Sequence, residues 1–227
     1  MLSNIVYNSE ALKDLGPMIQ MVKTEYHNPE TGEDGPIKWT SILQCINALS
    51  WTDSYTNILE IGAGNSVLPI MMADQQFEVT AIDKHILNNS VTKDIRIESE
   101  IIDAFEYLKN IPNNSLDIVV DSCSIIHYDI SPYYDGDHSD EHAYNTGCVN
   151  IAKLLSQKLK PDGLFITVSD FALKNGDNEF MSLDNLMECY HFGGLKLLGK
   201  IPEINDPYKY DYGKTELGIV RLIYGKN

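Results

Sequence analysis

The stretch N-I-L-E-I-G-A-G-N-S at residues 57–66 determines the fold class that we expect for this chain. Its first half is a short apolar run that predicts a buried strand, and the glycines at positions 62 and 64 predict a tight turn. Residues 66–73 then show a helical pattern, with Asn65 or Ser66 as the N-cap and Pro69 in the first turn. A strand, a glycine turn and a helix in this order bring backbone amides close to a ligand, so the stretch predicts a ligand-binding turn.

The rest of the chain continues this alternation of strands and helices. Strands are predicted at 77–82, 95–102, 116–121, 164–168, 195–201 and 217–224. Helices are predicted at 85–91, 104–110 and 183–190, and a further helix ends at about residue 159. The alternation predicts a doubly wound α/β fold, with a seven-stranded, mostly parallel sheet between layers of helices. Residues 202–215 join the last two strands without a clear helix, which predicts an antiparallel last strand.

Residues 1–50 precede the alternating pattern. Their apolar residues at helical spacing predict one helix over about 9–23, broken at Gly16-Pro17, and a second over 37–49. We therefore expect an N-terminal helical cap over 1–50 that does not fold independently, and a ligand-binding domain over 51–227. The length of 227 residues fits one domain with an appendage better than two domains.

Composition and charge exclude several classes of function. With 43% hydrophobic and 22% charged residues, the chain has a normal globular balance and is not a disordered protein. Its formal net charge of −16 repels phosphate groups, so we expect no nucleic-acid partner and no membrane partner. The acidity mainly favours solubility, although it would also favour a cationic ligand.

The cysteines and the N-terminus predict a cytoplasmic location. No two of the four cysteines, Cys45, Cys123, Cys148 and Cys189, have the close spacing of a zinc or redox motif, which is typical of free thiols in a reducing compartment. The first residues lack a basic region followed by an apolar run, so no signal peptide is expected. No apolar stretch approaches the length of a membrane span.

Two ligand classes use a glycine turn of this kind. A dinucleotide site has the pattern G-x-G-x-x-G, in which the third small residue lets the helix approach the pyrophosphate. Here that position is Val67, and the carboxylate of Glu60 just before the turn would repel a pyrophosphate. A carboxylate at this place suits a cationic amino-acid ligand better.

On these residues, the stretch resembles the first motif, E/D-x-G-x-G, of the class I S-adenosylmethionine-dependent methyltransferases. The resemblance implies that S-adenosylmethionine is the cofactor and S-adenosylhomocysteine the product. It also implies that the turn, Gly62, Ala63, Gly64 and Asn65, holds the methionine end, with Glu60 beneath it. An ordinary strand-to-helix turn of an α/β protein is the alternative interpretation.

Acidic residues follow at the ends of the next two strands. Asp83 can accept both ribose hydroxyls, as such a residue also does in NAD proteins, and Lys84 beside it is a further cofactor candidate. The resemblance implies that Asp103, Ala104 and Phe105 bind the adenine. Either acid could instead be a plain helix cap, and the two roles can coexist.

The end of the apolar strand 116–121 should lie next to the glycine turn, at the carboxyl edge of the sheet. The resemblance implies that residues 121–124 face the transferable methyl group, so Asp121 and Ser122 are cofactor candidates and Asp121 is a catalytic candidate. His127 could act as a general base, because histidine titrates near neutral pH. It could also simply pack beneath the loop, since positioning alone can supply most of the rate of a methyl transfer.

The substrate candidates come from the cap and from the loops. They are Trp39, His127, Tyr128, Tyr133 and Asp170. The loop 129–142 is rich in acids and contains no lysine or arginine, and we interpret it as a substrate lid. Catechol-type methyltransferases hold magnesium with an acid and an Asp-Asn pair, but Phe171 replaces that asparagine here, so no metal is expected.

The resemblance covers roughly residues 55–225, including an L-K-P-D-G-L strand entry at 159–164, and is specific for fold and cofactor but not for substrate. We expect methyl transfer to a small-molecule acceptor. One alternative is a lysine-directed protein methyltransferase, because G-A-G-N-S at 62–66 resembles a variant of that group. Others are a non-catalytic S-adenosylmethionine-binding protein and a nicotinamide-dependent oxidoreductase. The acceptor atom and the oligomeric state stay open.

Overall fold

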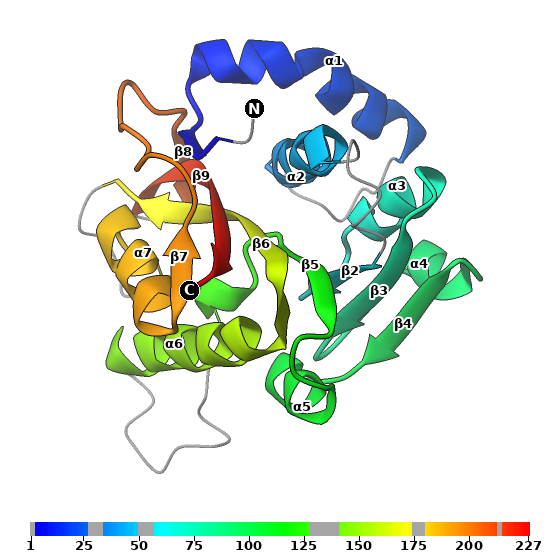
Figure 1. The fold of residues 1–227 in the computed structure, drawn as a ribbon. Helices are drawn as coiled ribbons and strands as arrows, with labels where there is room; N and C mark the ends of the chain where they lie inside the picture. The colour runs from blue at the N-terminus through cyan, green and yellow to red at the C-terminus, as the bar shows by residue number, and fades with distance from the viewer. Residues whose placement is uncertain (1–2, 27–33, 50–56, 128–140, 174–179, 213–214) are drawn as a thin grey trace.

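A computed structural model describes residues 3–26, 34–49, 57–127, 141–173, 180–212 and 215–227 (Figure 1). The elements, in chain order, are β1 (Ile5–Val6), α1 (Ser9–Glu25), α2 (Gly35–Leu49), β2 (Asn57–Ile61), α3 (Leu68–Asp74), β3 (Glu78–Asp83), α4 (Asn89–Lys93), β4 (Ile97–Ile101), α5 (Ala104–Asn110), β5 (Leu116–Asp121), the 3₁₀ helix η1 (Ile125–His127), α6 (Glu141–Lys158), β6 (Leu159–Ala172), α7 (Leu183–Phe192), β7 (Leu195–Leu197), β8 (Tyr210–Tyr212) and β9 (Thr215–Lys226). Figure 1 shows the sheet in the middle, with α1, α2 and α3 over one face and α5, α6 and α7 over the other.

The sheet has the order β1-β9-β6-β5-β2-β3-β4. Strands β2 to β6 pair in parallel, whereas β9 runs antiparallel to β6. The predicted doubly wound, mostly parallel sheet with an antiparallel last strand is confirmed. Among the described residues the sheet has nine strands rather than the predicted seven. The two additional strands, β1 and β8, are too short to show an alternating pattern, and they pair with β9.

Two predicted helices differ from the observed ones. The predicted break at Gly16-Pro17 is wrong, because α1 continues through it with Leu15 and Val22 buried. Since a proline removes only one helical hydrogen bond, the burial of this face outweighs the loss. The helix predicted at 85–91 is also wrong: Asn88 caps α4, which begins only at Asn89.

The core consists of two apolar layers, one on each face of the sheet. Because strand side chains alternate, Ile58 and Val120 face α1 to α4, whereas Leu59 and Val119 face α5 to α7. By the same alternation, the polar residues Glu60, Asp170 and Arg221 belong to the face covered by α1 to α4. In the described part of the chain, no helix is long and apolar enough to cross a membrane.

Candidate active site

A cavity of about 300 Å³ lies at the carboxyl ends of β2, β3 and β4, beside the loop that follows β5. It is lined by Ile61, Gly62, Ile82, Asp83, Lys84, His85, Ile102, Ala104, Ser124, Ile125 and His127. Doubly wound sheets bind their ligands at this edge, and the volume is within the range of small-molecule pockets. Five residues that the sequence singled out therefore line one cavity: Gly62, Asp83, Lys84, Ala104 and His127.

The glycine turn is held tightly between its neighbours. Gly62 has φ +66°, and a Cβ added there would lie 2.1 Å from the Cβ of Ser124. The Ser124 hydroxyl donates to the carbonyl of Ile61 at 2.9 Å, and the N–H of Ala63 donates to the carbonyl of Ile82 at 3.0 Å. The turn is thus fixed to the loop after β5 on one side and to β3 on the other, with no room for a side chain at position 62.

Asp83 closes the turn from the end of β3. Its Oδ2 accepts the N–H of Gly64 at 3.0 Å, and its Oδ1 accepts the N–H groups of His85 at 2.8 Å and Ile86 at 3.1 Å. These bonds replace the first turn of the helix predicted at 85–91. An ionised carboxylate has about four acceptor positions, so Asp83, which also lines the cavity, keeps capacity for a ligand hydroxyl.

Asp103 caps α5 at the opposite end of the cavity. Its Oδ1 accepts the N–H of Phe105 at 2.8 Å, and the ammonium of Lys84 lies 3.7 Å from its Oδ2. Ala104 lines the cavity, but neither Asp103 nor Phe105 is among its lining residues. The Phe105 ring instead lies under the Lys109 ammonium, 4.5 Å from its centroid. The capping role is therefore observed, and the adenine-binding role of Asp103 and Phe105 stays a prediction.

Asp121 is fully buried and does not line the cavity. Its Oδ1 accepts from the N–H groups of Ser124 and Ile125, and its Oδ2 accepts from the Thr167 hydroxyl at 2.9 Å. The Ser124 hydroxyl oxygen also lies 2.5 Å from Oδ1, so its single proton is shared between Asp121 and the carbonyl of Ile61. Burial raises its pKa, while these hydrogen bonds lower it. The contacts make Asp121 the residue that orients η1 and Ser124, rather than one in contact with a ligand. Ser122, predicted beside it, is also absent from the cavity lining.

Glu60 lies beneath the turn, fully buried at the end of β2. Neither of its carboxylate oxygens has a hydrogen-bond partner among the described residues. Its pKa is raised to about 8, chiefly by burial and further by Asp121 and Asp83, while the Ser66 hydroxyl opposes the shift. Burying a carboxyl group without a hydrogen-bond partner costs folding free energy. A cation bound near Glu60 would stabilise its ionised form.

His127 is exposed at the end of η1 and lines the cavity. The backbone N–H of His127 donates to the carbonyl of Ser124 at 3.1 Å. The His127 ring meets the Phe180 ring edge-on, with 5.2 Å between the ring centroids. The imidazole thus lies at the edge of the cavity on the side of the β5 loop.

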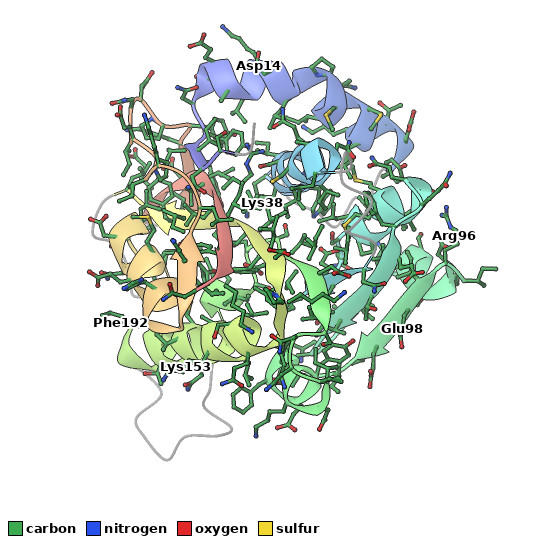
Figure 2. All side chains as sticks on the ribbon, viewed as in Figure 1. Asp14, Lys38, Arg96, Glu98, Lys153 and Phe192 are labelled. Carbon is green, nitrogen blue, oxygen red and sulfur yellow. The ribbon has the colours of Figure 1, made fainter. Side chains whose placement is uncertain are left out.

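A buried ionic cluster lies at the same sheet edge, under α2. The Lys38 ammonium lies 2.6 Å from Oδ2 of Asp170 and 2.6 Å from Oδ2 of Asp34 (Figure 2 labels Lys38 between α2 and the sheet). The Cys123 thiol donates to the same Asp170 oxygen at 3.0 Å, whereas Oδ1 of Asp170 is buried and has no hydrogen-bond partner among the described residues. The Tyr210 phenol also faces this carboxylate, and burial together with Asp170 raises the pKa of Tyr210. Burial would lower the pKa of Lys38, but its anionic surroundings outweigh burial and raise it.

Sequence reasoning selected Asp170 but missed Lys38 and Asp34. A signal was available, because Lys38 is the only charged residue of helix α2. Trp39, a substrate candidate, is 4% exposed and packs in the core, which favours its structural role. Tyr128, Tyr133 and positions 129–140 of the acidic loop lie outside the described residues.

Comparisons with known proteins agree with this architecture. No protein-family model and no curated protein matches the chain. The 1,6-didemethyltoxoflavin-N1-methyltransferase of Burkholderia thailandensis matches with a TM-score of 0.59 at 13% identity, over 100% of this chain and 93% of that one. Phosphoethanolamine N-methyltransferase 2 of Haemonchus contortus matches with a TM-score of 0.57 at 12% identity, over 83% of this chain. This chain spans about half, 52%, of that enzyme.

A third match is the cyclase SpnF, with a TM-score of 0.56 at 12% identity over 98% of this chain and 97% of that one. Identities this low show the fold and leave the chemistry to be argued from the site. The strand order, the glycine turn and these likenesses together show that the chain has the class I S-adenosylmethionine-dependent methyltransferase fold.

Proposed function

We propose that this chain transfers a methyl group from S-adenosylmethionine to a small-molecule acceptor. The observation that supports this most is the buried Glu60 carboxyl, which has no hydrogen-bond partner among the described residues; it lies beneath a glycine turn whose Gly62 lines the cavity, although Glu60 itself is not a lining residue. Neighbours of this fold were crystallised with S-adenosylmethionine or S-adenosylhomocysteine. The fold alone is not sufficient, because a cyclase shares it.

The residues present fit this cofactor. The turn from Gly62 to Asn65 would hold the methionine end, and the Glu60 charge beneath it would attract the ammonium and the sulfonium. Asp83 would accept a ribose hydroxyl, and Asp103 with Ala104 and Phe105 would receive the adenine, with Lys84 beside it. When bound, the cofactor supplies a methyl group on a positively charged sulfur, which is a good leaving group.

The same region fits a dinucleotide poorly. Val67 stands where a dinucleotide site needs a small residue, and its side chain is 4% exposed in the core beside α3. A pyrophosphate above Glu60 would only raise the pKa of its carboxyl further, whereas a cation there would favour the ionised carboxylate. Both features favour S-adenosylmethionine over NAD.

The ionic cluster under α2 is our candidate for acceptor recognition. Cys123 joins it to the cavity, because its neighbour Ser124 lines the cavity while its thiol contacts Asp170. Two carboxylates and one ammonium leave the cluster with excess negative charge, and Oδ1 of Asp170 has no hydrogen-bond partner among the described residues, although the Tyr210 phenol faces its carboxylate. An acceptor that donates an N–H or O–H would satisfy this oxygen. His127 would stand on the other side as the candidate general base.

Calorimetry with S-adenosylmethionine, S-adenosylhomocysteine and NAD tests the cofactor. We expect the first two to bind and NAD to bind much more weakly; tighter binding of NAD would refute the proposal. Incubation of the cofactor with the protein and a small-metabolite pool should generate S-adenosylhomocysteine. Product formation with protein extract alone would favour the lysine-directed alternative, and binding without turnover on either pool would favour a non-catalytic protein.

Asp83→Asn is expected to weaken S-adenosylmethionine binding by about tenfold or more, because the amide loses both a charge and an acceptor at the turn. Asp94→Asn is the matched control. Asp94 also accepts a backbone N–H two residues on, that of Arg96 at 3.0 Å, but it lies at the surface away from the cavity. The Kd of S-adenosylmethionine is measured by calorimetry for both variants. An equal loss of affinity in the two would contradict a role of Asp83 in ligand binding.

Asp170→Asn is expected to raise the KM for the acceptor by about tenfold, while the Kd of S-adenosylmethionine changes less than about twofold. The matched control is Asp117→Asn, since Asp117 is equally buried and pairs with Lys160 at 2.6 Å in another part of the sheet. Both variants should lose stability in urea titrations, but only the first should change KM. A KM shift in both, or in neither, would remove Asp170 from the acceptor site.

A further inference from the structure

A second cavity of about 300 Å³ lies among β1, β9, α1 and α2, and it shares no lining residue with the candidate active site. Its walls include the apolar side chains of Ile5, Ala11 and Leu15. Arg221 of β9, 6% exposed, also lines it. A charged side chain is rarely buried to this extent without a partner of opposite charge.

Among the residues that the structure describes, the Arg221 guanidinium is bound by neutral acceptors only. Its Nε and Nη2 donate to the carbonyl of Ser3 at 3.3 and 3.2 Å, and its Nη1 donates to the carbonyl of Ser41 and to Oε1 of Gln44, both at 3.1 Å. These bonds use four of its five N–H groups, which leaves one on Nη2. No carboxylate among the described residues forms an ion pair with it.

The other titratable groups of this cavity do not neutralise Arg221. Burial raises the pKa of the Tyr7 phenol, and it raises that of the Cys45 thiol to about 11, although Arg221 opposes both shifts. Both groups are therefore uncharged at neutral pH. The one acid in the lining, Asp14, is exposed on α1 (Figure 2) and makes no ion pair with Arg221. The cavity thus holds a buried cation that forms no ion pair with a described residue. Its lining is apolar on the side of Ala11 and Leu15 and polar at Ser3 and Gln44.

We propose that this cavity binds a small monocarboxylate, with its carboxylate on the free Nη2 N–H of Arg221 and its apolar tail against Ala11 and Leu15. A guanidinium and a carboxylate form charge-assisted hydrogen bonds, and the bound anion supplies the missing countercharge. One available donor and one cation suit a singly charged group better than a phosphate. At about 30 Å³ for each non-hydrogen atom, as for water, the volume admits a ligand of roughly ten such atoms.

Sodium butyrate is the probe. Its binding to the full chain is measured by thermal unfolding and by ligand-observed NMR, both at constant ionic strength. Butyrate should raise Tm in a saturable manner, because a ligand of the folded state stabilises it by mass action. Butyramide and butylamine, which have the same tail without the anion, should not. Equal shifts with all three probes, or none with butyrate, would overturn the proposal.

Two variants locate the binding. Arg221→Gln removes the cation and should weaken butyrate binding at least tenfold. Because this variant also loses hydrogen bonds that hold β9 to Ser3 and α2, Ala11→Leu serves as a second test: it fills the cavity from α1, leaves Arg221 in place and should also abolish butyrate binding. Undiminished binding by either folded variant would place the carboxylate elsewhere. S-adenosylmethionine binding, measured in the same samples, is expected to be unchanged, so failure here leaves the proposed function untouched.

Discussion

Gly62→Ala is expected to lower the free energy of unfolding by on the order of 4 kcal/mol and to abolish binding of S-adenosylmethionine. The new Cβ would lie 2.1 Å from the Cβ and 2.3 Å from the hydroxyl oxygen of Ser124. The backbone at φ +66° would add conformational strain to this overlap. Ser124 cannot retreat without breaking its hydrogen bonds to Ile61 and Asp121, so the turn itself must move.

Urea unfolding and calorimetry of Gly62→Ala test this, with Gly64→Ala as the matched control. Gly64 has φ +44°, but its added Cβ would lie 3.5 Å from the nearest atom, Oδ2 of Asp83, which is an ordinary contact. Gly64→Ala should therefore lower the free energy of unfolding by only about 1 kcal/mol, from backbone strain alone. In the double variant Gly62→Ala/Ser124→Gly the overlap disappears, and we expect at least half of the lost stability to return. Similar losses for the two single variants, or no rescue, would contradict the steric argument.

The sequence predicted the parts of the site whose signal is local. A strand followed by a glycine turn is encoded in adjacent residues, and so are acids such as Asp83 and Asp103 that end a strand and cap the next segment. The order of these segments along the chain was then sufficient to predict the doubly wound sheet and to place Gly62 and Asp83 at one edge. The likeness to solved structures of the same fold agrees with this part of the prediction.

What could not be predicted depends on contacts between distant segments. Lys38 and Asp170 are 132 residues apart, and nothing near either of them indicates the other. Similarly, the strand end at Asp121 predicts a ligand-facing acid, but the Thr167 hydroxyl from β6 and the loop after β5 occupy its oxygens. A strand of two residues such as β1 gains its stability from pairing with β9, not from its own sequence.

Glu60 affects both the stability of the protein and the proposed binding of S-adenosylmethionine. Its substitution should therefore have the second large effect, a change in how stability depends on pH. The pKa of this carboxyl is raised from 4.5 to about 8 in the folded protein, chiefly by burial. Above pH 4.5 the unfolded chain has released a proton that the folded chain still holds, so the contribution of Glu60 to stability is complete at low pH and is lost as the pH rises to about 8. The neutral side chain of Glu60→Gln has no such dependence.

Glu60→Gln should therefore gain stability relative to the natural protein by on the order of 3 kcal/mol as the pH rises from about 5.5 to 7.5. Urea titrations at both pH values measure this difference, within a range that avoids the sequence pI of about 4.6. A constant difference would contradict the raised pKa. The same variant should bind S-adenosylmethionine more weakly, since the ammonium and sulfonium of a bound cofactor favour the ionised carboxylate and lower its pKa.

This argument makes proton release the specific signature of Glu60. Titration of S-adenosylmethionine at pH 7 in two buffers with different ionisation enthalpies should show up to about one more proton released by the natural protein than by Glu60→Gln. Any proton lost by the cofactor itself is common to both proteins and cancels. Where the urea titrations have confirmed the raised pKa, equal proton release would mean that Glu60 stays protonated beneath the turn. Its burial would then serve the fold alone, and the electrostatic argument for a cationic ligand would fail even if the cofactor binds.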